Sequence, residues 1–204
     1  MRLKLLAAFA PLSLAACVTP PGDVEVTRFV AADTGSRLGT GTIFVETAAG
    51  TDGQALELAP YKAAVARELA ALGYREAARN QANQIAQVSI DRGVLDAGDR
   101  RGPVSVGVGG STGSYGSGVG LGVGVNLGGG RKEEIATRLE VRIRDKANEA
   151  VLWEGRALFD VATSSILADS AQNASVMAEA LFRSFPGNSG ETVLVPVQRS
   201  NPDE

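Results

Sequence analysis

Residues 138–161 constrain the fold of this chain more than any other stretch. Apolar residues alternate there with charged residues on both sides of a short turn. Period-two alternation is typical of a β-strand with one buried face, and two such runs around an Asp- and Asn-containing turn predict a β-hairpin. The hairpin needs a cover for its apolar face. The apolar residues are Leu139, Val141 and Ile143 before the turn, and Val151, Trp153, Ala157, Phe159 and Val161 after it.

The charged residues of the hairpin favour one strand register. If the apolar residues of both strands share a face, pairing Arg142 with Glu154 also pairs Glu140 with Arg156. A shift of two residues would place Glu140 opposite Glu154 instead. Opposite charges across an antiparallel pair stabilise it by roughly 0.2–1 kcal/mol, and like charges destabilise it. We therefore expect the first register.

Two amphipathic helices can cover the hairpin. The first is predicted to begin at about Pro60, because proline suits a first helical turn, and to end before Gly73. The second is predicted to be capped by Asp169, with Gln172 three residues later as in a capping box, and to end at residues 186–187. Their apolar stripes are Leu58, Tyr61, Val65, Leu69 and Leu72 in the first helix, and Leu167, Ala171, Ala174, Ala178, Leu181 and Phe185 in the second.

Four more segments have the composition of strands. They are Val24 to Phe29, Thr42 to Glu46, Ile85 to Leu95 and Thr192 to Val197, the last of which is predicted to be an edge strand because it contains Pro196. Together these elements predict the α+β class: a single two-layer domain whose mainly antiparallel sheet carries two helices packed on one face. The domain is expected to span residues 24–197, with a glycine-rich insert at residues 102–130 and a flexible tail at residues 198–204.

The insert at residues 102–130 has three interpretations. Its alternation of valine or leucine with glycine favours a β-hairpin, but interior glycine weakens strands, which favours a loose loop. Small residues recurring four apart would suit a membrane-inserting helix, although the polar run at residues 111–117 interrupts any apolar span of ~20 residues. It is not a phosphate-binding loop, because residues 107–113 lack the P-loop spacing and no lysine follows.

The start of the chain resembles the signal peptide of bacterial lipoproteins. Arg2 and Lys4 precede an apolar stretch, residues 5–14, that is too short to span a bilayer as a helix. The sequence Leu14-Ala15-Ala16-Cys17 then matches a lipobox. The resemblance implies that residues 1–16 are removed, that Cys17 is the lipidation site and that residues 17–23 form a lipidated tether. Because Val18 rather than aspartate follows the cysteine, it also implies a periplasm-facing lipoprotein of the outer membrane in a Gram-negative bacterium.

The composition excludes several kinds of chemistry. The chain has no histidine and one cysteine, which excludes Ser-His-Asp and Cys-His catalysis and removes the usual zinc ligands. Its 20 basic and 23 acidic residues give no basic excess for nucleic acid. Removal of Arg2 and Lys4 leaves 18 basic residues, so the net charge falls from −3 to −5. We therefore expect no enzymatic activity, cofactor, metal, nucleic acid or small-molecule substrate.

Paired charges flank the insert and are the remaining candidates for chemistry. Basic pairs there could contact lipid phosphates, but we favour a solvated rim at the base of a loop. Trp153 shares the apolar face of the hairpin, so core packing is expected rather than ligand binding. Lys62 and Lys146 fall on a helix and in a turn, which does not suit a buried base. The flanking pairs are Asp96 with Asp99, Glu133 with Glu134, Arg100-Arg101 and Arg131-Lys132.

Three motifs, taken with the lipobox and the glycine-rich insert, resemble a known family. They are ELAALGY at residues 68–74, LEVRIRD at 139–145 with LWEGRA at 152–157, and LFRSFP at 181–186. The family is the bacterial lipoprotein family called domain of unknown function 4136, and the resemblance covers about Val24 to Pro186. The hairpin turn departs from it, because Asn148-Glu149 stands where the family often has glycine.

The resemblance implies the same fold and an envelope location, with no known activity or catalytic residues. We therefore expect a non-enzymatic, lipid-anchored binding or scaffold domain. Its partners would be the membrane, through the anchor, and other envelope proteins. The alternative is a membrane-active or self-assembling protein that acts through residues 102–130.

Overall fold

The computed structural model describes residues 22–32, 34–50, 55–95 and 133–197 of the chain. The predicted signal peptide, Cys17, the insert and the tail lie outside the described residues. The described part forms one seven-stranded sheet in the order β3-β2-β4-β5-β6-β1-β7. The strands are β1 (Val24–Val30), β2 (Thr42–Thr47), β3 (Arg75–Glu76), β4 (Gln84–Leu95), β5 (Glu134–Asp145), β6 (Val151–Ala162) and β7 (Thr192–Val195).

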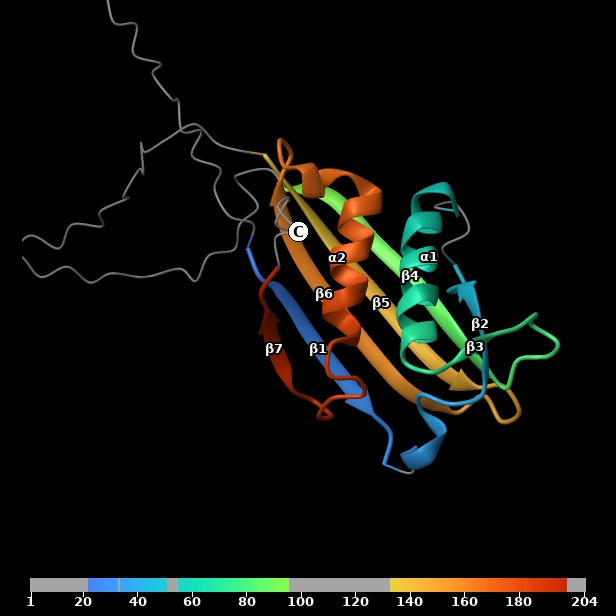
Figure 1. Ribbon diagram of the computed structural model, residues 1–204. Coiled ribbons are helices and arrows are strands. Elements are labelled where there is room, and N and C mark those ends of the chain that lie inside the picture. The colour runs from blue at the N-terminus through green and yellow to red at the C-terminus, as the bar shows by residue number, and fades with distance from the viewer. Residues whose placement is uncertain (1–21, 33, 51–54, 96–132, 198–204) are drawn as a thin grey trace, which may run out of the picture.

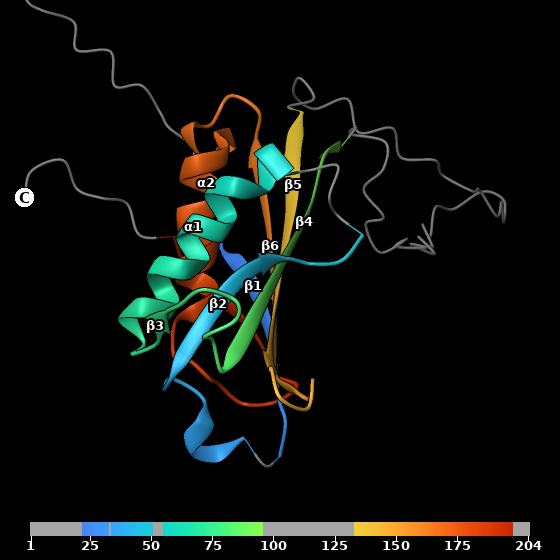
Figure 2. The same cartoon turned by 90° about the vertical axis from the view of Figure 1, so that its right-hand side faces the viewer.

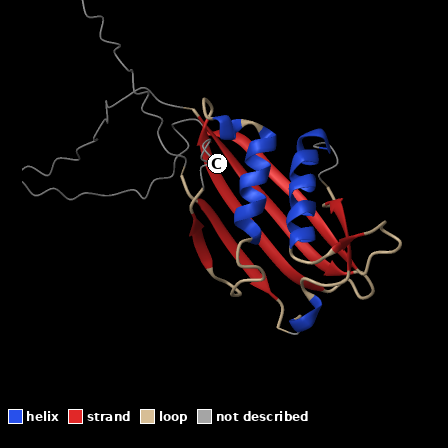
Figure 3. Ribbon diagram, viewed as in Figure 1, coloured by secondary structure: helices blue, strands red, loops and turns tan. Residues whose placement is uncertain are grey.

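Both long helices, α1 (Ala55–Ala71) and α2 (Ser170–Phe182), pack side by side on one face of the sheet (Figures 1 and 2). Two short 3₁₀ helices, η1 (Gly35–Arg37) and η3 (Ile166–Ala168), lie in the connections. The pairing is antiparallel except where β2 runs parallel to β3 and β4. The predicted α+β two-layer fold is therefore confirmed (Figure 3). No described helix combines the length and the hydrophobicity that crossing a bilayer requires.

The central hairpin has the expected register. Arg142 lies opposite Glu154 and Glu140 lies opposite Arg156, and both pairs form ion pairs. A β-bulge follows Ile143, where the strands approach the turn. Glu149 in that turn has a φ of 60°, a backbone conformation that favours glycine.

The helix boundaries differ from the expected ones. Helix α1 begins at Ala55, so Pro60 lies inside it rather than at its start; the buried Leu58 holds the preceding turn against the core. Helix α2 ends at Phe182, four residues before Pro186, because the chain becomes extended at Arg183 and left-handed at Ser184.

The capping and burial of α2 are partly as expected. The Asp169 side chain accepts hydrogen bonds from the backbone N–H groups of Ala171 and Gln172, which confirms the cap. The N–H of Asp169 donates to the carbonyl of Ile166, so Gln172 does not complete a capping box. Ala171 is exposed, contrary to the predicted stripe, and Asn173, with Met177, is buried in its place.

Trp153 lies in the centre of the core, as predicted. Its ring stacks on Phe182 at a centroid distance of 5.3 Å and contacts Phe185 at 5.2 Å. Its indole N–H donates to the carbonyl of Pro186 at 2.9 Å, which satisfies the one polar group of the ring. A side chain at Gly155 would overlap the indole. Trp153 and Gly155 therefore pack together in the core.

Candidate functional site

The structure places few of the sequence-predicted site residues. Glu133 and Glu134 stand at the start of β5, where Glu134 lies opposite Leu95. Lys146 donates from its ammonium group to the carbonyl of Asn80 at 2.8 Å, so it supports the turn. Within the described ranges, no group of three metal-ligating side chains comes together. The predicted residues outside those ranges are Cys17, Asp96, Asp99, Arg100, Arg101, Arg131 and Lys132.

No described element covers the second face of the sheet, which we call the uncovered face (Figure 2). Its centre is a ladder of charges on β5 and β6. Arg142 pairs with Glu154 at 3.0 Å, and Arg156 pairs with Glu140 at 2.7 Å. Arg156 also contacts Glu154. The two arginine side chains are about 45% exposed, so each pair contributes at most ~1 kcal/mol to stability.

The ladder continues across β4 and β2. Glu46 accepts hydrogen bonds from Arg79 at 2.8 Å and from Gln87 at 3.1 Å. Burial raises the pKa of Glu46, but these hydrogen bonds and the charge of Arg79 outweigh burial and hold it below its ordinary value. A hollow of about 30 Å³ lies between the two parts of the ladder, lined by Ala48, Gln87, Ser89, Glu140, Arg142 and Glu154.

Apolar side chains border this polar strip on the side of β1 and β7. The Arg156 guanidinium lies over the ring of Phe29, 5.6 Å from its centroid, an arrangement that attracts a cation to an aromatic face. Leu158 and Leu194 flank Glu25 across three neighbouring strands. All three apolar side chains are exposed. Aromatic residues and arginine are the types that protein interfaces enrich, so the uncovered face is the candidate binding surface.

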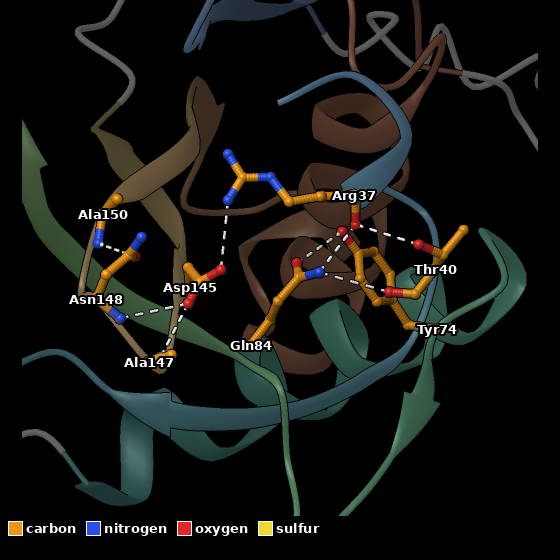
Figure 4. Close-up of polar contacts among 8 residues, drawn as sticks. All are labelled: Arg37, Thr40, Tyr74, Gln84, Asp145, Ala147, Asn148 and Ala150. Atoms are coloured by element: carbon orange, nitrogen blue, oxygen red, sulfur yellow. Dashed lines mark hydrogen bonds and ion pairs between the residues drawn. The ribbon is translucent and has the colours of Figure 1, made fainter. Parts of the chain in front are cut away.

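A polar cluster at the hairpin end of the sheet has a different role (Figure 4). The buried Gln84 accepts a hydrogen bond from Tyr74 at 3.2 Å and donates to the carbonyl of Arg37 at 2.8 Å. The Arg37 side chain reaches Asp145 at 3.3 Å, and the Asp145 carboxylate accepts from the backbone of Ala147 in the hairpin turn. These bonds fasten the η1 loop to the hairpin turn. Burial raises the pKa of Tyr74, as expected for a structural phenol.

Sequence analysis missed Arg28, which is only 5% exposed. Its guanidinium donates to the carbonyls of Leu181, Ala180 and Arg183, at 2.9, 3.0 and 2.7 Å respectively. A cation at a helix C-terminus satisfies the free carbonyls and the negative end of the dipole. Burial lowers the pKa of Arg28, and the charge of Glu191 opposes that shift. The sequence did indicate that Arg28 points into the core, because Arg28 is in phase with the inward residues Val24 and Val26 of β1.

Arg92 contacts the chain at the N-terminal end of α2. It follows Ala86, Val88 and Ile90 on the covered face of β4 and donates to Ser170 at 2.9 Å and to the carbonyl of Ala168. The buried Arg28 and the partly buried Arg92 thus connect the two ends of α2 to the sheet.

Two solved structures are distantly similar to this chain. No curated protein matches the chain. Among solved structures, it is similar to a PDZ domain protein from Parabacteroides distasonis, with 13% identity and a TM-score of 0.49 over 85% of this chain and 39% of that one. The chain therefore spans about two fifths of that protein. It is also similar to the PelC dodecamer from Paraburkholderia phytofirmans, with 12% identity and a TM-score of 0.41 over 78% and 94% of the two chains.

The profile of the family described as "Domain of unknown function (DUF4136)" matches residues 35–187. That range runs from η1 through the hairpin and both helices to the loop that follows α2, and it contains the three motifs from which the resemblance was inferred. The chain belongs to this family.

Proposed function

We propose that this protein is a lipid-anchored, periplasm-facing protein of the outer membrane, and that its domain binds another envelope protein without catalysing a reaction. The observation that carries the proposal is the division of the sheet. Buried polar groups and the aromatic cluster lie on the helix side. The uncovered face presents half-exposed arginines, carboxylates and apolar side chains with no described cover.

The chemistry of that face suggests the partner. Phe29, Leu158 and Leu194 provide an exposed apolar border. The adjacent strip carries paired positive and negative groups at β2, β5 and β6, with the neutral Gln87 of β4 between them. Alternating charges select a partner of complementary pattern more than they add affinity. The expected partner is therefore a protein surface with an apolar centre and mixed charges beside it, rather than a polyanion.

The tether supports an envelope partner. Strand β1 begins at Val24, seven residues after Cys17. Seven extended residues reach about 25 Å at most, so an acylated Cys17 would keep the domain close to the bilayer surface. Substitution of Cys17 by alanine should abolish palmitate labelling and release the protein from membranes. Unchanged membrane partition of Cys17→Ala would contradict the anchor.

Site-specific photocrosslinking tests the binding surface. A benzophenone amino acid at Leu158 on the uncovered face should give a discrete envelope-protein adduct in cells. The matched control is the same probe at Ala63, which is exposed on α1 in the opposite layer. Equal adducts from both positions, or none from Leu158, would contradict binding through the uncovered face.

The alternative function, membrane activity through residues 102–130, can be tested by removing the insert. Leu95 and Glu134, between which the insert leaves and returns, lie directly opposite each other at the end of a twelve-residue ladder. The insert can therefore be replaced by a short Gly-Ser turn without cutting a strand. If the alternative holds, the non-lipidated chain floats with anionic liposomes and the shortened chain does not; if the binding proposal holds, neither floats.

A further inference from the structure

The two edges of the sheet differ in their protection against strand pairing. On one edge, β3 has only two residues, Arg75 and Glu76, and both are charged and exposed. Beside it, β2 carries the Glu46–Arg79 ion pair. Charged and very short edge strands are the usual means by which proteins prevent edge-to-edge association.

The opposite edge, β7, lacks charged residues. Its sequence is Thr-Val-Leu-Val, and Leu194 is 65% exposed. No described strand lies beyond it (Figure 1). An uncharged, apolar edge strand is a template for pairing with another strand. The contrast with β3 indicates that this edge is an interaction surface.

The backbone groups that β7 offers follow from its pairing with β1. The N–H of Arg28 donates to the carbonyl of Glu191, so Arg28 directs its backbone groups towards β7. Antiparallel alternation then directs the backbone of Val193 and Val195 towards β1. The N–H and C=O groups of Thr192 and Leu194 consequently point out of the sheet.

We propose that a second copy of this chain pairs with β7 in antiparallel orientation about a two-fold axis, with Val193 opposite Val193 of the second copy. Thr192 of each copy then exchanges both backbone hydrogen bonds with Leu194 of the other. The two Leu194 side chains become diagonal neighbours on the uncovered face, within reach of each other. Glu191 falls opposite Val195, so no like charges meet. A second copy fits this edge because the strand is complementary to itself.

The two neighbouring registers would leave backbone groups of β7 without a hydrogen-bond partner. Centring the pair on Leu194 would place Thr192 opposite Pro196, which has no N–H to donate. Centring it on Thr192 would place Leu194 opposite Gly190, whose N–H already donates to the carbonyl of Arg28 at 2.7 Å. The register centred on Val193 retains all four backbone hydrogen bonds. It also keeps the helices of both copies on one face and joins the two uncovered faces into one surface.

Disulfide trapping tests the pairing in the full chain. In a non-hydrogen-bonded antiparallel pair the two Cα atoms are ~4.5 Å apart, within the range of about 4.4–6.8 Å that a disulfide spans. Val193→Cys should therefore give a covalent dimer on mild oxidation, linked at the two substituted positions. Arg75→Cys on the protected edge should stay monomeric under the same conditions. The parent chain, which retains Cys17, controls for links through that residue.

A second measurement does not depend on thiol chemistry. The parent should have twice the chain mass by light scattering, and Leu194→Lys should return it to the mass of one chain, because two lysines would then be diagonal neighbours. Leu194 is exposed, so circular dichroism of Leu194→Lys should match the parent. A monomeric parent would overturn the proposal. An extended segment of another protein would then be the candidate partner for this edge. A dimer that persists in Leu194→Lys, or equal trapping from Arg75→Cys, would also overturn it. None of these outcomes depends on the envelope partner of the proposed function.

Discussion

Arginine has different roles on the two faces of the sheet. On the covered face, Arg28 and Arg92 are largely buried and donate to main-chain carbonyls next to the ends of α2, and Arg92 also lies 3.8 Å from the carboxylate of Glu57. On the uncovered face, Arg142 and Arg156 are half-exposed and pair with carboxylates. Water can replace the partners of an exposed arginine, but it does not reach the carbonyls that a buried one satisfies. The covered face therefore holds the fold, and the uncovered face is the one on which we place the proposed binding.

The largest expected effect is at the centre of the covered face. Trp153→Ala removes the ring that packs against Phe182 and Phe185 and leaves a cavity above Gly155. Such a loss destabilises a domain by about 3–5 kcal/mol, measured as the free energy of unfolding in urea. An unchanged unfolding midpoint would show that Trp153 does not hold the core.

Arg28 provides the next test, since its charge is buried on the same side. Arg28→Met retains much of the side chain's volume but leaves the carbonyls of Ala180, Leu181 and Arg183 without their donor. Hydrogen bonds to charged groups contribute about 1.5–3 kcal/mol, so we expect a loss of that order in the free energy of unfolding. Arg28→Lys, which keeps the charge with fewer donors, should recover part of the loss. Full stability of Arg28→Met would contradict the capping role.

Substitution of an arginine on the uncovered face should change the free energy of unfolding only slightly. Arg156→Ala breaks the pairs with Glu140 and Glu154, yet exposed ion pairs contribute only about 0.2–1 kcal/mol. A double-mutant cycle with Glu140→Ala isolates the coupling between the two side chains. A coupling energy as large as the stability loss expected for Arg28→Met would contradict the proposed difference between the two faces.

Substitution of Glu68 should have the smallest effect on stability, and it should stabilise the domain rather than destabilise it. Burial, followed by the charge of Glu179, raises the pKa of Glu68. Between the ordinary and the raised pKa the folded state binds more protons than the unfolded state, so this group reduces stability as pH rises. Glu68→Gln should remove that dependence and slightly raise the free energy of unfolding at neutral pH, because a neutral amide is penalised less by burial than a carboxylate. Lower stability of Glu68→Gln at pH 7 would contradict the assignment.

The sequence predicted those features whose determinants are close together in the chain. The hairpin register followed from charges at fixed offsets from one turn, and the Asp169 cap followed from its own first turn. The end of α2 did not follow, because its cap is Arg28, 153 residues from Leu181. The parallel pairing of β2 with β4 depends on a crossover through α1, which local alternation does not encode.

The candidate site was predictable only in part. The alternating charges of β5 and β6 indicated an exposed face, and Trp153 was correctly assigned to the other side. The contact between Phe29 and Arg156 depends on the placement of β1 beside β6. No sequence period links residues so far apart, so the apolar border of the face became visible only in the fold.

One measurement tests the central claim most directly: stability and crosslinking compared in a single variant of the uncovered face. The variant replaces Glu140, Arg142, Glu154 and Arg156 by glutamine, which leaves the net charge unchanged. We predict that its free energy of unfolding stays within about 2 kcal/mol of the parent, since only exposed ion pairs are lost, while the photocrosslinked adduct from Leu158 disappears. An unfolded variant would show that this face holds the fold, and an undiminished adduct would show that its charges do not select the partner.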